Sequence, residues 1–317
     1  MSGIKAKEMV ITVVSFVITF IALSYMALLY EGRTAGYIKT RVISSYTGNE
    51  TLKPYGVAVS PDGLNVYVSS IKNSSISVLV PPQKAGEEWA IKNTFGVKGD
   101  KPGRFNEPSG ICVDSAGNIY AADTVNGRIQ KFSPDGKFIT AIDYSKSIFY
   151  MPRNTVIAPD GDIYVANTGK WNIYRFSGAG EKRGTFAAMS GEVFGLAVDN
   201  KGRVLAANAK TGMIEIFTPN LEQLITVSVK EWKSVENNTP MIALDSKGNL
   251  YAVARAAKAI IVFKPAGDGY KRAGVIANDE NGRKIFTDPL SIAIDINGNI
   301  YVTESAADKV LKIKPEL

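Results

Sequence analysis

Apolar and polar positions along the chain follow a unit that recurs six times. Each unit contains an apolar strand, a turn that ends in glycine, and two further strands in which apolar and polar residues alternate. Residues 103–138 show the pattern most clearly. The turn glycines are Gly63, Gly117, Gly161, Gly202, Gly248 and Gly298. Alternation with a period of two predicts β-strands, and glycine supplies the positive φ angle that a tight hairpin requires.

The spacing of the copies predicts a β-propeller. Repeats at roughly 40–50 residues are typical of four-stranded propeller blades. The first five copies continue into a fourth strand, whereas the sixth stops after its third strand, at Leu317. Residues 37–46 show the same alternation, and we expect them to complete the last blade and remove an exposed sheet edge. We therefore predict an all-β fold in which residues 37–317 form a six-bladed propeller with four-stranded antiparallel blades.

A different pattern precedes the propeller. Residues 9–30 carry no charged side chain, and at about 1.5 Å per residue such a helix crosses a bilayer core of about 30 Å. We predict a transmembrane helix over 9–30, after a short tail (1–8) and before a linker (31–36). Its length favours an uncleaved signal-anchor, and a cleaved signal peptide is the alternative.

Basic residues flank the apolar segment on both sides. Lys5 and Lys7 precede it closely, and a large domain follows it. Both features favour an amino terminus inside the cell. We therefore expect a single-pass protein of the cell membrane, with the propeller on the extracytoplasmic side, either periplasmic or extracellular.

Composition narrows the possible chemistry. The chain contains no histidine, which excludes an imidazole base, a Ser–His or Cys–His pair and a His-ligated metal or haem. The single cysteine, Cys112, can form no intramolecular disulfide, and its apolar neighbours indicate a buried hydrophobe. The net charge of +7 fits either an ordinary lysine-rich surface or an anionic partner. We expect no cofactor and no bound metal.

The repeats resemble those of the NHL repeat family. The second copy carries the family pattern most fully, at Gly103, Phe105, Pro108, Gly110, Asp114, Gly117, Tyr120, Asp123, Asn126, Arg128, Ile129, Phe132 and Gly136. The other copies keep the strand pattern but lose parts of the polar set. The resemblance covers residues 37–317 and implies a six-bladed propeller. It leaves function open, because NHL propellers serve as interaction domains, RNA binders, extracellular sensors and, in relatives, enzymes.

Polar residues end most of the second strands, at positions that hold Ser70, Asp123, Asn167, Asn208, Ala254 and Glu304. We expect these positions at the top face, defined as the face that carries the loops after the second strands and between the blades. One interpretation is a ring that binds a ligand or a cation. The other is structural, since short polar side chains anchor a following loop by accepting hydrogen bonds from its backbone N–H groups.

The mouth of the central channel offers a second group of candidates, namely Tyr55, Ser109, Arg153, Phe194, Met241 and Leu290. Only Arg153 is charged, and only Tyr55 is an aromatic residue with a polar tip, so channel packing is the alternative here. Together with Arg255 of a top loop, the predicted ligand-binding set is Tyr55, Asp123, Arg153, Asn167, Asn208, Arg255 and Glu304.

Three long connections between blades carry aromatic residues. Phe105, Trp232 and Phe286 lie in residues 97–107, 230–240 and 278–289. Aromatic residues between charged ones are typical of protein interfaces. Packing that anchors the loops is the alternative.

The leading functional hypothesis is a membrane-anchored binding or scaffold module, which takes a protein partner, a membrane complex or an anionic ligand at its top face. An enzyme of the propeller lactonase or lyase type is the second hypothesis. The resemblance places lactonase metal ligands at positions that here lack any carboxylate, namely Gly56, Gly110, Asn154, Gly195, Met241 and Ser291. RNA or polyanion binding is the third and requires a cytoplasmic propeller; otherwise nucleic acid is not an expected partner.

Overall fold

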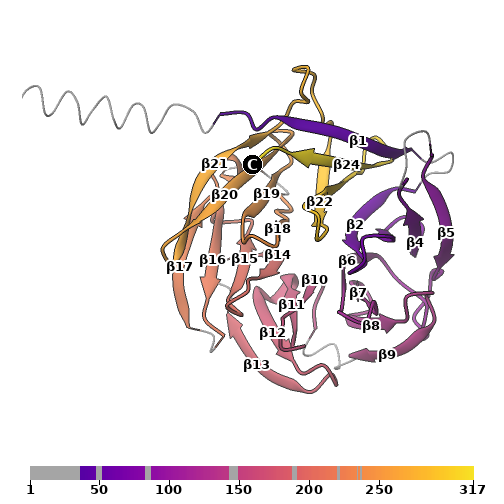
Figure 1. The fold of residues 1–317 in the computed structure, drawn as a ribbon. Coiled ribbons are helices and arrows are strands. Elements are labelled where there is room, and N and C mark those ends of the chain that lie inside the picture. The colour runs from indigo at the N-terminus through magenta and orange to yellow at the C-terminus, as the bar shows by residue number, and fades with distance from the viewer. Residues whose placement is uncertain are drawn as a thin grey trace, which may run out of the picture.

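The structure, a computed structural model, describes residues 36–47, 52–82, 87–142, 149–187, 191–219, 222–233, 235 and 238–317. Within them, six four-stranded antiparallel sheets are arranged as blades around a central axis (Figure 1). The predicted six-bladed propeller is confirmed. The predicted transmembrane helix (9–30), the tail before it and residues 31–35 of the linker lie outside the described residues. No helix in the described part of the chain is long and apolar enough to cross a membrane.

Blades 1 to 3 are each formed by four consecutive strands, which run outward from the channel. Blade 1 contains β2 (Pro54–Val59), β3 (Val66–Ser70), β4 (Ser75–Val80) and β5 (Ala90–Phe95). Blade 2 contains β6 (Pro108–Val113), β7 (Ile119–Asp123), β8 (Arg128–Phe132) and β9 (Phe138–Ile142). Blade 3 contains β10 (Pro152–Ile157), β11 (Ile163–Asn167), β12 (Asn172–Phe176) and β13 (Lys182–Ala187), with the short 3₁₀ helix η1 (Thr168–Lys170) after β11.

Blades 4 and 5 repeat this order, and blade 6 differs in its outer strand. Blade 4 contains β14 (Val193–Val198), β15 (Val204–Asn208), β16 (Met213–Phe217) and β17 (Gln223–Ser228), and is followed by η2 (Lys230–Trp232). Blade 5 contains β18 (Ile242–Leu244), β19 (Leu250–Ala254), β20 (Ala259–Ala266) and β21 (Gly269–Ile276). Blade 6 contains β22 (Pro289–Ile294), β23 (Ile300–Glu304), β24 (Lys309–Pro315) and, as its outer strand, β1 (Thr40–Thr47).

The two ends of the described chain close the ring together. Strand β1 pairs antiparallel with β24, from Thr40 opposite Pro315 to Thr47 opposite Lys309. Just before β1, the backbone N–H of Ile38 donates to the carbonyl of Val275 at 2.8 Å, so the chain also touches the outer strand of blade 5. The predicted closure of the last blade by the N-terminal strand is therefore what the structure shows.

The hairpin between the first and second strands explains why a glycine recurs at the turn of each repeat. In blade 2, the carboxylate of Asp114 accepts hydrogen bonds from the backbone N–H groups of Ala116 and Asn118, and Gly117 N–H donates to the Asp114 carbonyl at 2.9 Å. Gly117 has a φ angle of +85°, which costs a side chain steric strain but costs glycine little. The turn glycines of the other blades also have positive φ angles.

The core lies between the faces of neighbouring blades. The second strands are buried along their whole length, and four of them place a fully buried tyrosine there, namely Tyr67, Tyr164, Tyr251 and Tyr301. The hydroxyl groups of Tyr251 and Tyr301 donate to the turn carboxylates of Asp245 and Asp295, at 3.0 and 3.2 Å. A large ring with a satisfied polar tip fixes one blade against the next. The blades thus hold the top-face loops on a rigid frame.

Candidate binding site at the top face

The polar ends of the second strands lie inside the protein. Asp123, Asn167 and Asn208 are 0% exposed, and Glu304 is 1% exposed. Each accepts hydrogen bonds from backbone N–H groups of top-face loops. These four residues therefore do not form an accessible ring, and their observed bonds are those of the structural interpretation.

Asp123 is the centre of the densest polar network. One carboxylate oxygen accepts from the backbone N–H of Asn106 at 2.7 Å, and the other accepts from Asn126, Arg128 and Gln130 at 2.8, 2.8 and 3.0 Å. Burial raises the pKa of the Asp123 carboxyl, while these donors oppose that rise. The network thus holds a buried carboxylate beside a buried guanidinium. Removing either partner would leave the other charge buried and unpaired, which is strongly destabilising.

The same network fastens the long loop before blade 2. Arg128 donates to the carbonyl groups of Lys101 and Arg104, each at 3.0 Å. Gln130 donates to the carbonyl of Arg104 at 2.7 Å, and Asn126 donates to that of Gly99 at 2.9 Å. The family pattern in this blade therefore serves to hold a loop in place.

Asn167 and Asn208 act in the same way in blades 3 and 4. The side-chain oxygen of Asn167 accepts from the backbone N–H of Tyr150 at 2.7 Å. That of Asn208 accepts from the N–H groups of Lys210 and Thr211 at 3.0 and 3.2 Å. Both amides fix loops that surround the top face.

Glu304 of blade 6 is less completely satisfied. Its Oε2 accepts from the backbone N–H groups of Thr287 and Asp288, at 2.8 and 3.0 Å, and from the Thr287 hydroxyl. Its Oε1 is buried and has no hydrogen-bond partner among the described residues. The network at the end of the second strand in blade 6 thus contains fewer hydrogen bonds than the network in blade 2.

Tyr55, Arg153 and Arg255 come together at the top mouth of the channel. Burial raises the pKa of the Tyr55 hydroxyl, and the positive charges of Arg153 and Arg255 oppose the rise. The three residues belong to blades 1, 3 and 5, so they approach the axis from alternating directions. This cluster, which we call the mouth cluster, is the part of the predicted set that remains accessible in part.

Two carboxylates that the sequence did not single out complete the mouth cluster. Asp288 binds the Arg255 guanidinium with both oxygens, at 2.5 and 2.9 Å. The hydrogen bond from Arg255 holds the pKa of Asp288 below its usual value. Glu107 lies near enough to Tyr55 to raise the pKa of its hydroxyl slightly. The one available signal was their position, because each residue immediately precedes the inner strand of its blade.

The aromatic residues of the long connections are buried. Phe105, Trp232 and Phe286 are 0%, 1% and 2% exposed. The indole Nε1 of Trp232 donates to the carbonyl of Val253 at 2.7 Å. Of the two interpretations that the sequence left open for these three residues, the structure supports loop anchoring and not an exposed interface. In the part of the chain that the structure describes, no group of three or more His, Cys, Asp or Glu residues is placed to hold a metal ion.

Comparison with known families and proteins supports the architecture. Residues 105–132 match the model of the NHL repeat. The chain is 30% identical over 165 residues to Protein brain tumor of Drosophila melanogaster, which covers 47% of this chain and 15% of that protein. It is 35% identical over 86 residues to the B-box type zinc finger protein ncl-1 of Caenorhabditis elegans, which covers 26% of this chain and 10% of that protein. The chain thus spans a small part of these relatives.

Solved structures show the same fold at low identity. Virginiamycin B lyase from Staphylococcus aureus superimposes with a TM-score of 0.60 and 13% identity, over 87% of this chain and 99% of the lyase. At that identity the likeness concerns the fold alone. None of these similarities supports setting nucleic acid aside as a partner. The chain is a six-bladed β-propeller with an NHL repeat at residues 105–132.

Proposed function

We propose that this propeller is a binding module that holds an acidic group of a partner protein at the mouth cluster. The observation that carries the proposal is which charged and polar groups surround Arg153. Its positive charge lies near enough to the Tyr55 hydroxyl to oppose the rise in the pKa of that group, and no carboxylate among the described residues forms an ion pair with it. A guanidinium presents several donors in a fixed plane, which suits a carboxylate or a phosphate.

Within the mouth cluster, Arg153 is the residue that suits an anion. The charge of Arg255 is balanced by Asp288, whereas Arg153 forms no ion pair within the part of the chain that the structure describes. Glu107 lies near Tyr55 and brings the formal charge of the cluster to zero, so the proposal rests on the guanidinium of Arg153 and not on a net positive charge. An incoming carboxylate would therefore find a guanidinium and a hydroxyl near each other, and both can donate hydrogen bonds to it.

The sequence supports an anchored form of this module. The uncharged segment at residues 9–30 is our basis for proposing a signal-anchor in the cell membrane, with the propeller on the extracytoplasmic side. A domain on a short tether suits a scaffold that recruits a protein to a membrane complex.

The test starts from the full-length protein, extracted from its native membranes with a gentle detergent. Mass spectrometry should find a protein that co-elutes in stoichiometric amount with the wild type. Arg153→Glu should reduce its recovery or affinity at least about tenfold, which corresponds to roughly 1.4 kcal/mol. Arg104→Glu is the matched control, because Arg104 is an exposed arginine of a top-face loop.

Two results would contradict the proposal. One is equal recovery of the partner with wild-type protein and Arg153→Glu. The other is a co-eluting RNA in place of a protein, with affinity that falls steeply as salt rises. In that case the top face would be a nucleic-acid surface.

A further inference from the structure

The central channel narrows just below the mouth cluster. At this level three blades contribute glycine, namely Gly56, Gly110 and Gly195. A Cβ atom on these residues would lie 2.3, 2.6 and 2.7 Å from backbone oxygens of the next blade, so neighbouring inner strands approach too closely for a side chain. The other three blades place Asn154, Met241 and Ser291 at the same level.

A cavity of about 400 Å³ lies on the bottom side of this constriction. Residues from all six inner strands line it, and none of them is charged. Its lower walls are a ring of half-buried aliphatic residues, one from each blade: Val59, Val113, Ile157, Val198, Leu244 and Ile294. The inner strands have no neighbouring strand on their channel side, so backbone N–H and C=O groups also face this space. The cavity therefore combines aliphatic walls with uncharged hydrogen-bonding groups.

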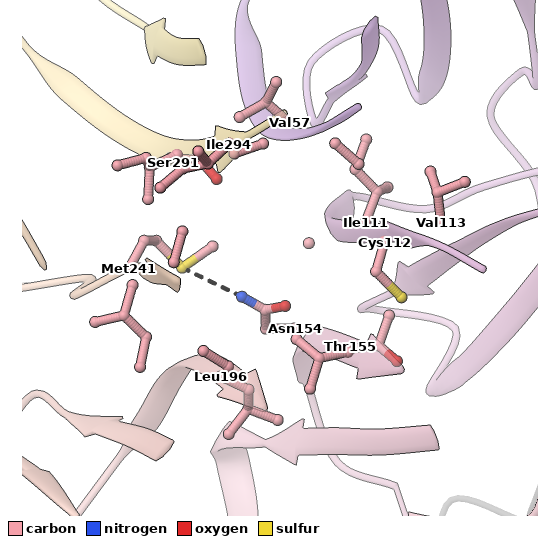
Figure 2. A pocket seen from close by; sticks show the side chains of 18 of the residues that line it. Val57, Ile111, Cys112, Val113, Asn154, Thr155, Leu196, Met241, Ser291 and Ile294 are labelled. Carbon is pink, nitrogen blue, oxygen red and sulfur yellow. Dashed lines mark hydrogen bonds between the residues drawn. The ribbon is translucent and has the colours of Figure 1, made fainter. Parts of the chain in front are cut away.

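Asn154 is one of the polar residues that line this space, together with Thr155 and Ser291. Figure 2 shows its carboxamide and the Met241 thioether pointing toward each other across the channel. The amide nitrogen lies 3.5 Å from Met241 Sδ, and no other hydrogen bond to the Asn154 side chain is found among the described residues. Asn154 is 8% exposed. A thioether is a weak acceptor, so a carboxamide with one strong acceptor and two donors is left almost without partners.

This carboxamide favours a ligand that can hydrogen-bond with it. A ligand with a complementary donor and acceptor would give the Asn154 carboxamide strong hydrogen bonds that the described side chains do not offer it. A charged ligand would find no counter-charge in the lining, and an unpaired buried ion is strongly unfavourable. The volume lies within the range of about 300–1,000 Å³ that is usual for small-molecule sites.

We propose that the lower half of the channel binds a small neutral molecule with an amide head and an aliphatic body. The head pairs with the Asn154 carboxamide at the closed end, and the body lies against the aliphatic ring. This site is separate from the mouth cluster, because Tyr55 and Arg153 lie on the other side of the constriction. It involves no charge and no metal.

The test is calorimetric titration of the full-length protein with hexanamide, octanamide and decanamide. Each amide is compared with the carboxylate and the primary amine of equal chain length. We expect at least one amide to bind, at least tenfold more tightly than its charged counterparts. Asn154→Leu should abolish binding, whereas Met241→Leu, which conserves size and removes only the thioether, should retain it. Thermal unfolding of each variant shows whether it is folded.

Asn154→Asp keeps the shape of the side chain and adds one negative charge, so it tests the site independently of Asn154→Leu. It should shift the preference from the amide to the amine by at least tenfold. The proposal is overturned if no amide binds the wild type up to the millimolar range. It is equally overturned if Asn154→Leu binds as the wild type does, or if Asn154→Asp leaves the preference unchanged.

Discussion

Blades 2 and 6 both use a buried carboxylate to anchor a loop, but the carboxylate of blade 2 has more hydrogen-bond donors around it. Each buries a carboxylate at the end of its second strand, and each carboxylate accepts hydrogen bonds from the backbone of the loop before its blade. Asp123 also receives three side-chain donors, one of them the buried Arg128. Among the described residues, Glu304 receives one side-chain donor, the Thr287 hydroxyl, and its Oε1 has no partner.

The difference follows from the residues after each carboxylate. In blade 2 the positions three, five and seven residues later hold Asn126, Arg128 and Gln130, whereas blade 6 has Ala307, Lys309 and Leu311 there. Both loops are nevertheless anchored. The backbone bonds to one oxygen are therefore sufficient to position a loop, and the additional side-chain donors of blade 2 neutralise and enclose the charge.

The largest effect should come from Asp123→Asn. The change leaves the guanidinium of Arg128 buried without its carboxylate, and breaking a buried pair in this way costs about 3–5 kcal/mol. Urea denaturation should show a decrease of that size in the free energy of unfolding. A decrease below about 1 kcal/mol would mean that the network contributes little beyond packing.

Glu304→Gln should have a smaller effect. Its remaining oxygen can still accept from the backbone N–H groups of Thr287 and Asp288, and no buried cation is left unpaired. We expect a decrease of about 1 kcal/mol, the difference between a charge-assisted and a neutral hydrogen bond. The same denaturation measurement applies, and a loss as large as that of Asp123→Asn would remove the contrast between the two blades.

The contrast can also be reduced by adding a donor to blade 6. Ala307 is exposed and occupies the position of Asn126, three residues after the carboxylate. Ala307→Asn should donate to Glu304 Oε1 and raise the free energy of unfolding by about 0.5–1 kcal/mol. Combined with Glu304→Ala, the same substitution should give no gain, and a gain there would show that the effect arises elsewhere.

The smallest effect concerns the pH dependence of the stabilisation that the pair of Arg255 and Asp288 provides. The folded-state pKa of Asp288 is lowered by its bond from Arg255, so the stabilisation is present above the unfolded-state pKa of about 4 and is lost as pH falls through the lower folded value. The Arg255 side chain is 40% exposed, so the pair contributes less than about 1 kcal/mol. The stability difference between wild type and Arg255→Gln should therefore shrink below about pH 4, and a constant difference would contradict this assignment.

The fold was predictable because its signals are local. A hairpin requires its glycine and its aspartate within four residues, as at Asp114 and Gly117, and the alternation of each strand is visible in a few consecutive positions. The unpaired edge of the sixth repeat also identified residues 37–46 as its partner, and strand β1 occupies that place.

The candidate site was predictable only in part. Position in the repeat correctly placed Asp123 and Glu304 at strand ends, yet it did not show that both are buried. The pair of Arg255 and Asp288 joins residues 33 positions apart, and the contact of Asn154 with Met241 joins residues 87 positions apart. Such contacts depend on the curvature of the ring, which no local pattern contains.

The sequence by itself determined the repeat, the number of blades, the closing strand and the absence of histidine chemistry, because each of these depends on residue type and short spacing. Only the tertiary structure decided which polar residues hold loops, which arginine at the mouth lacks a carboxylate partner within the described ranges, and where the channel narrows. Those features arise where six inner strands converge on one axis, so residues far apart in the chain become neighbours and compete for the same hydrogen bonds.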